Sequence, residues 1–67
     1  MSRENIIQNL NGQIETLARL HIQHGLDKTE HFQSHKESIT EYVTEHSIDV
    51  RSELDPVSRN LYRRYFG

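Results

Sequence analysis

At 67 residues the chain fits one small domain, residues 1–67, whose core is too small for high stability without a partner. It has no cysteine, which excludes disulfides, and its net charge of −2 gives no overall nucleic-acid signature. No apolar run is long enough for a signal peptide or a membrane span. We therefore expect a soluble cytoplasmic protein that forms a homo-oligomer, binds a partner, or does both.

The first predicted element is a long amphipathic helix over residues 3–24. Its apolar and histidine positions recur at alternating spacings of three and four, which keeps them on one face. They are Ile7, Leu10, Ile14, Leu17, His21 and His24. Ser2 is a suitable N-cap. We interpret Asn11-Gly12 as a weak point in a continuous helix, because the flanking residues do not alternate as in strands; a kink or break there is the alternative.

A second helix of similar length follows over residues 28–46. Its seam positions are Phe32, His35, Ile39, Tyr42 and His46. Gly25 suits the left-handed residue that ends the preceding helix. Asp27 and Glu30 have the spacing of a capping box that begins the second. At about 1.5 Å per residue, each helix is roughly 30 Å long. Two such helices joined by a short loop predict an antiparallel helical hairpin.

Residues 47–54 are ambiguous, and residues 56–66 form the last predicted helix. Three apolar residues in the first segment alternate with polar ones: Ile48, Val50 and Leu54. A single short strand would have no partner, so we expect a connector or a helical turn. Asp55-Pro56 predicts an N-cap followed by the first helical residue. The face expected to meet the core carries Val57, Leu61 and Tyr65. The predicted fold class is all-α: an antiparallel helical hairpin plus a short C-terminal helix, a three-helix unit that self-associates.

The charges are unevenly distributed along the chain. Residues 1–55 carry five Lys/Arg against ten Asp/Glu, a charge of −5, whereas residues 56–67 carry three arginines and no acid, a charge of +3. Arginine and aromatic side chains mix in this basic-aromatic tail, and both are enriched in protein-binding hot spots. The predicted partner-binding residues are Arg59, Tyr62, Arg63, Arg64, Tyr65 and Phe66. We therefore expect a non-enzymatic regulator or adaptor that binds another protein.

Two other interpretations of the tail stay open. In a structural one, Leu61 and Tyr65 complete the core while Tyr62, Arg63 and Phe66 form a more exposed face. In the other, the chain is a small nucleic-acid-binding regulator, because arginines contact phosphates and aromatic rings stack on bases. Three arginines supply little phosphate-binding energy, so a protein partner is the leading hypothesis.

Four histidines lie near the turn that joins the two long predicted helices. They are His21, His24, His31 and His35. The hairpin brings these ends together, and imidazole nitrogens are ligands of zinc, so a zinc site is one hypothesis. Structural zinc sites usually include cysteine, and histidine is also favoured at helix C-termini by the helix dipole alone. A pH sensor is a second hypothesis, because histidine titrates near neutral pH.

Catalysis has little support in the sequence. There is no cysteine nucleophile, no glycine-rich phosphate loop and no recognisable catalytic motif. Glu37, Glu41 and Glu45 repeat every four residues, which is typical of a solvated helix face. We therefore expect the chain not to be an enzyme and to need no cofactor.

Overall fold

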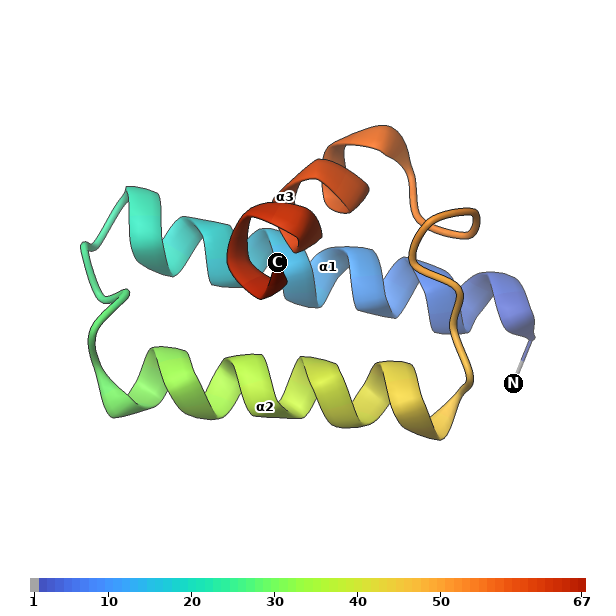
Figure 1. Cartoon of the computed structure of the whole chain (residues 1–67), viewed down its shortest axis with the longest axis horizontal. Coiled ribbons are helices and arrows are strands. Elements are labelled where there is room, and N and C mark those ends of the chain that lie inside the picture. The colour runs from blue at the N-terminus through green and yellow to red at the C-terminus, as the bar shows by residue number, and fades with distance from the viewer. Residues whose placement is uncertain (1) are drawn as a thin grey trace.

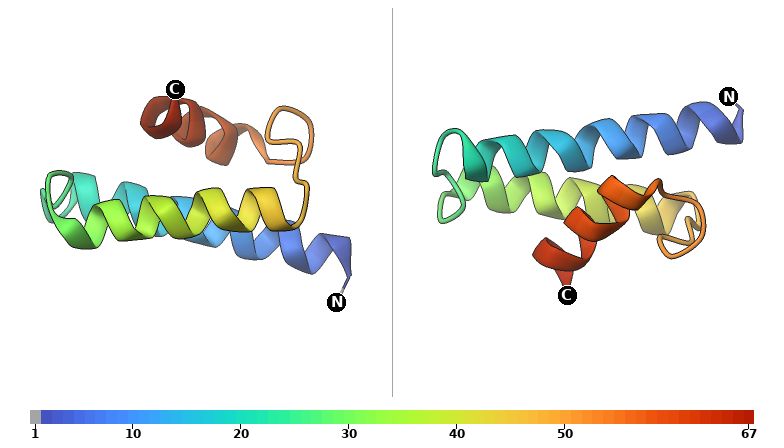
Figure 2. Two further views of the ribbon diagram at one scale, coloured as in Figure 1. Left: turned by 60° about the horizontal axis from the view of Figure 1, so that its bottom comes forward. Right: turned by 90° about the horizontal axis from the view of Figure 1, so that it is seen from above.

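The computed structural model describes residues 2–67, which contain three helices and no strand. They are α1 (Arg3–Ile22), α2 (Glu30–Glu45) and α3 (Pro56–Phe66) (Figure 1). α1 and α2 lie antiparallel, and α3 forms a second layer that packs against α1 (Figure 2). The predicted all-α hairpin with a short C-terminal helix is therefore confirmed.

α1 begins and continues as its sequence predicts. The Ser2 hydroxyl accepts the Asn5 N–H at 3.3 Å, which caps the first turn. The helix runs unbroken through Gly12. It ends at Ile22, short of the predicted residue 24, and Gly25 follows with a φ of +62°. A residue in this left-handed conformation reverses the chain, as expected for glycine after a helix.

α2 begins later than predicted, and Asp27 is not its cap. The Thr29 hydroxyl accepts the Phe32 N–H at 3.2 Å, so the helix starts at Glu30. The preceding residues form a separate turn, in which the Thr29 N–H donates to the Leu26 carbonyl at 3.1 Å. Because the chain is still turning at Asp27, its carboxylate does not reach the first helical N–H groups.

The C-terminus of α2 is closed by a motif that the sequence did not indicate. After Glu45 the chain passes through Ser47, which has a φ of +49°. The Ser47 N–H donates to the Thr44 carbonyl at 3.2 Å, and the Ile48 N–H donates to the Val43 carbonyl at 3.0 Å. These two nested bonds define a Schellman motif, which usually carries glycine at the left-handed position.

Replacing Ser47 with glycine is expected to stabilise the protein by about 1 kcal/mol. A residue with a Cβ is strained at this φ, by roughly 1–2 kcal/mol, and glycine relieves the strain at some cost in unfolded-state entropy. Urea denaturation of the Ser47→Gly variant should show a higher midpoint with an unchanged slope. A lower midpoint would mean that the serine side chain stabilises the folded state by more than the backbone strain destabilises it.

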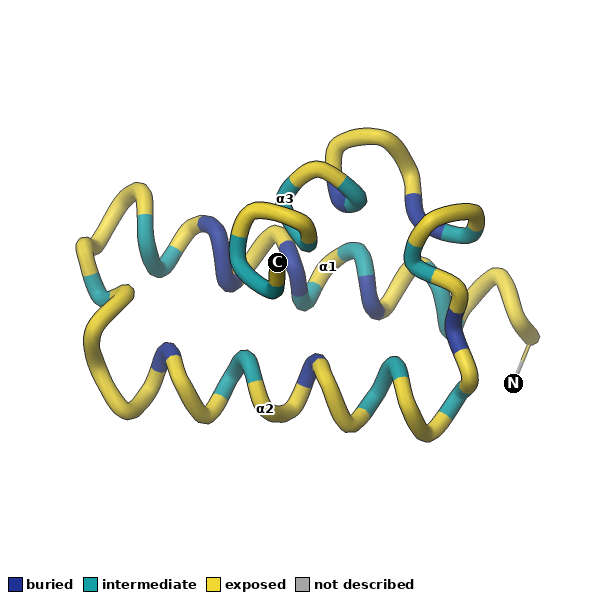
Figure 3. Tube along the Cα trace, viewed as in Figure 1, coloured by how far each residue is buried: buried dark blue, intermediate teal, exposed yellow. Residues whose placement is uncertain are grey.

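The core lies between the two long helices, and the connector from α2 to α3 adds buried residues to it (Figure 3). Its buried cluster consists of Leu10, Ile14, Leu17, Phe32, Ile39, Ile48 and Leu54. Five of the apolar residues in the predicted seam are therefore buried, and Ile7 and Tyr42 are half-buried against them. The Tyr42 hydroxyl donates to the Ile6 carbonyl at 3.1 Å, which ties α2 to the first turns of α1. Of the seam histidines, His24 is exposed and the others are half-buried.

Val57 does not face the core, contrary to the sequence-based prediction. Its side chain is 62% exposed, whereas Ser58 beside it is fully buried. The inward stripe of α3 thus keeps Leu61 and Tyr65 but begins at Ser58, and Leu54 supplies the apolar contact before the helix starts. The Ser58 hydroxyl oxygen has no hydrogen-bond partner within residues 2–67.

A single arginine anchors the connector to the start of α1. The Arg3 guanidinium donates to both Glu53 carboxylate oxygens, at 2.8 and 2.7 Å, and to the carbonyls of His46 and Ser47, at 2.6 and 3.1 Å. Glu53 also accepts the Asp49 N–H at 2.7 Å. Residues 46–55 therefore form hydrogen-bonded turns, as the connector hypothesis expected.

This anchor predicts a pH dependence of stability. The hydrogen bonds from Arg3 and from the Asp49 N–H hold the pKa of Glu53 below its ordinary value of 4.5. A depressed pKa in the folded state adds stability that is present above the unfolded pKa and is lost as the pH falls through the folded pKa. Wild type should therefore exceed Glu53→Gln in unfolding free energy at pH 7, and the gap should close below pH 4.5. A gap independent of pH would contradict this.

Candidate functional site

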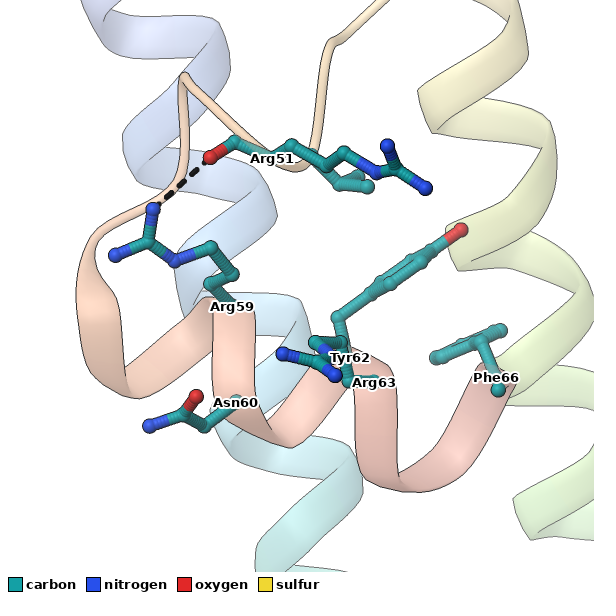
Figure 4. A pocket seen from close by; sticks show the side chains of 8 residues that line it. Arg51, Arg59, Asn60, Tyr62, Arg63 and Phe66 are labelled. Carbon is teal, nitrogen blue, oxygen red and sulfur yellow. Dashed lines mark hydrogen bonds between the residues drawn. The ribbon is translucent and has the colours of Figure 1, made fainter.

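α3 and the connector enclose an open groove on the surface (Figure 4). Its lining residues are Val50, Arg51, Arg59, Asn60, Tyr62, Arg63, Phe66 and Gly67. Val50 and Arg51 come from the connector, and the others come from α3 and the residue that follows it. The Arg59 guanidinium donates to the Arg51 carbonyl at 2.9 Å, which closes one end of the groove.

An aromatic pair forms the other end of the groove. The rings of Tyr62 and Phe66 are stacked, with centroids 4.4 Å apart and an interplanar angle of 12°. The Lys36 ammonium of α2 lies 5.3 Å from the centroid of the Phe66 ring. Both aromatic residues are half-buried and pack against the core cluster. The pair is therefore held in a fixed orientation before any ligand arrives.

The groove is positively charged. Arg51, Arg59 and Arg63 line it, and no acidic residue is among its lining residues. Across residues 2–67, the ion-pair distance is met only by Arg3 and Glu53. The three groove arginines thus have no carboxylate partner in the described part of the chain, and apart from the Arg59 N–H bonded to the Arg51 carbonyl their guanidinium donors are available to an external anion.

Tyr65 faces the hairpin and not the groove. Its hydroxyl and the His21 Nδ1 share a hydrogen bond of 2.7 Å, and the two rings are T-shaped with centroids 5.4 Å apart. Its ring also packs in a T-shaped arrangement against Phe32, with the ring centroids 5.9 Å apart. Tyr65 therefore connects α3 to both helices of the hairpin and holds α3 in the position that shapes the groove.

The structure thus divides the six predicted partner-binding residues. Arg59, Tyr62, Arg63 and Phe66 line the groove together. Tyr65 serves packing, and Arg64 is exposed outside the lining, with its guanidinium carbon 5.8 Å from the Tyr65 ring centroid. The expected inward face of Leu61 and Tyr65 is present, but Tyr62 and Phe66 are also half-buried.

Val50, Arg51 and Asn60 were missed by sequence reasoning. Asn60 follows Arg59 in the tail and is exposed. The prediction selected arginine and aromatic residues, so it left out this amide. Val50 and Arg51 reach the groove because the connector folds so that they lie beside α3. Their position depends on hydrogen-bonded turns, and no short sequence motif in residues 47–54 predicts these turns.

The histidines at the hairpin turn do not converge. His21 is bonded to Tyr65, and the His35 Nε2 lies 3.3 Å from the Gln13 carbonyl of α1. His24 and His31 are exposed. Within residues 2–67, no three His, Asp or Glu side chains are placed to hold one metal ion. A shared zinc site would require these four side chains to rearrange, and zinc binding and pH sensing stay predictions.

Comparisons with known proteins add no function. No protein family matches the chain, and no curated protein or solved structure is significantly similar to it. Within residues 2–67, no helix has the length and apolar character needed to cross a membrane. The groove beside α3 is therefore the basis for assigning a function.

Proposed function

We propose that the chain is a non-enzymatic interaction module, a small regulator or adaptor that binds another protein through the groove beside α3. The observation that carries this proposal is the set of three arginines without carboxylate partners around a stacked aromatic pair. Arginine and tyrosine are among the residues that contribute most binding energy per contact at protein interfaces.

The fixed geometry of the groove supports the same proposal. Ordering a free side chain on binding costs about 0.5–1.5 kcal/mol, and stacking of Tyr62 on Phe66 has already met part of that cost. The hydrogen bond from Arg59 to the Arg51 carbonyl likewise orders one guanidinium group before a partner binds. A small surface can therefore give useful affinity, and a chain of this size offers only a small surface to a partner.

Site-directed photo-crosslinking tests this function in the native host. A photoreactive residue replaces Asn60, which is exposed in the groove, and in a control it replaces Gln23, an exposed amide at the α1–α2 turn. We expect position 60 to capture a specific protein that position 23 does not. The adduct should disappear when Arg59 and Arg63 are changed to Ala in a folded variant. Identical adducts at both positions, or adducts insensitive to the arginines, would contradict the proposal.

A further inference from the structure

The charge and shape of the groove limit what can occupy it. We propose that the occupant is an acidic-hydrophobic peptide segment, in which at least two carboxylates flank one apolar side chain. This inference rests on the proposed function, and it specifies the chemistry of the partner.

The carboxylates follow from the arrangement of the cations. Arg59 and Arg63 are four residues apart on α3, so their side chains leave the helix on the same side, with Cβ atoms about 6 Å apart. Arg51 extends from the connector along the opposite wall. A guanidinium group presents a planar pair of donors that matches a carboxylate, and none of these groups pairs with an acid of residues 2–67. Two or more external carboxylates complement this arrangement.

The apolar side chain of the occupant follows from the apolar residues that line the groove. Val50, Tyr62 and Phe66 are half-buried, so each leaves part of its surface open to solvent between the arginines. Covering this surface with a Leu or a similar side chain removes apolar area from water and excludes water from the neighbouring ion pairs. An occupant with charge alone would leave that area wet.

The aromatic pair disfavours nucleic acid as the occupant. Base stacking requires an open ring face. Tyr62 stacks on one face of the Phe66 ring, and the Lys36 ammonium lies 5.3 Å from the centroid of the same ring, so less ring surface is open to a base than on two separate rings. The acidic character of residues 1–55, at −5, also opposes a polyanion that extends beyond the groove. A short segment with local negative charge avoids this repulsion.

Neighbouring arginines provide a matched test. Arg63 is exposed and lines the groove, whereas Arg64 is also exposed but lies outside the lining and makes no hydrogen bond through its side chain within residues 2–67. Fluorescence anisotropy would follow a short labelled peptide in which Asp and Glu flank one Leu. We expect Arg63→Glu to weaken binding about tenfold and Arg64→Glu to leave it nearly unchanged. Circular dichroism would establish that both variants keep the helical fold.

Altered peptides and a nucleic-acid probe test the acidic-hydrophobic occupant against the alternatives. A peptide with Ser in place of Leu should bind more weakly, and a peptide with Lys in place of the acids should not bind. Equal losses in both arginine variants would indicate attraction by overall charge and overturn the inference. Binding of a single-stranded oligodeoxynucleotide at the same site, without peptide binding, would also overturn it in favour of nucleic acid. A protein captured at position 60, with no binding of the acidic peptide, would remove this inference and leave the proposed function standing.

Discussion

Replacing Ile39 with alanine is expected to leave much of the protein unfolded at 25 °C. Ile39 is fully buried on α2 and belongs to the cluster that joins both long helices. Such a truncation costs about 2–5 kcal/mol, while a core in a chain of this size supplies roughly 3–5 kcal/mol in total. Far-UV circular dichroism during urea titration should show a large loss of the folded baseline.

Val57→Ala is the matched control for that experiment. Both substitutions shorten a β-branched side chain on a helix, but Val57 is 62% exposed. We expect a change within about 0.5 kcal/mol. Comparable destabilisation by the two substitutions would mean that α3 packs through the face first predicted from its sequence.

Replacing Tyr65 with alanine is expected to detach α3 from the hairpin, at a cost of about 2 kcal/mol. The change removes the ring contact with Phe32 and the hydrogen bond to His21 together. Although Tyr65 does not line the groove, the variant should also bind the acidic peptide poorly, because the walls of the groove separate when α3 moves. Chemical denaturation and anisotropy measure the two effects.

Tyr65→Phe separates packing from the hydrogen bond. It keeps the ring and removes only the hydroxyl, so the expected cost is about 1 kcal/mol and peptide binding should be retained. If the alanine and phenylalanine variants lost the same stability, the ring would not be what holds α3. If the alanine variant bound the peptide as wild type does, the groove would not depend on the docking of α3.

Most of the predictions that depend on local chemistry agree with the structure, although Asp27 as a cap and Val57 as a core residue do not. Side chains at spacings of three and four mark the buried faces of α1 and α2, and Ser2 and Asp55 cap their helices as expected. Such signals work because each involves residues within one or two turns. The early start predicted for α2 failed because Thr29, and not Asp27, follows the last turn of the loop.

The groove could not be assembled from the sequence alone. Arg51 is brought to α3 by a connector that Arg3 fixes from almost the opposite end of the chain, through the carboxylate of Glu53. The separate roles of Tyr62 and Tyr65 depend on how α3 is rotated over α1. Both features depend on contacts between distant segments, which a helical pattern does not encode.

Chemical-shift mapping by NMR tests the central claim most directly. The acidic peptide, or the protein captured by crosslinking, is added to the ¹⁵N-labelled chain and the backbone amides are followed. We predict that the largest shifts lie at Arg51, Asn60 and Arg63, with little change at the α1–α2 turn around Gly25. Shifts concentrated at that turn, or spread evenly over the exposed face of α2 that carries Glu37, Glu41 and Glu45, would show that the groove beside α3 is not the binding surface.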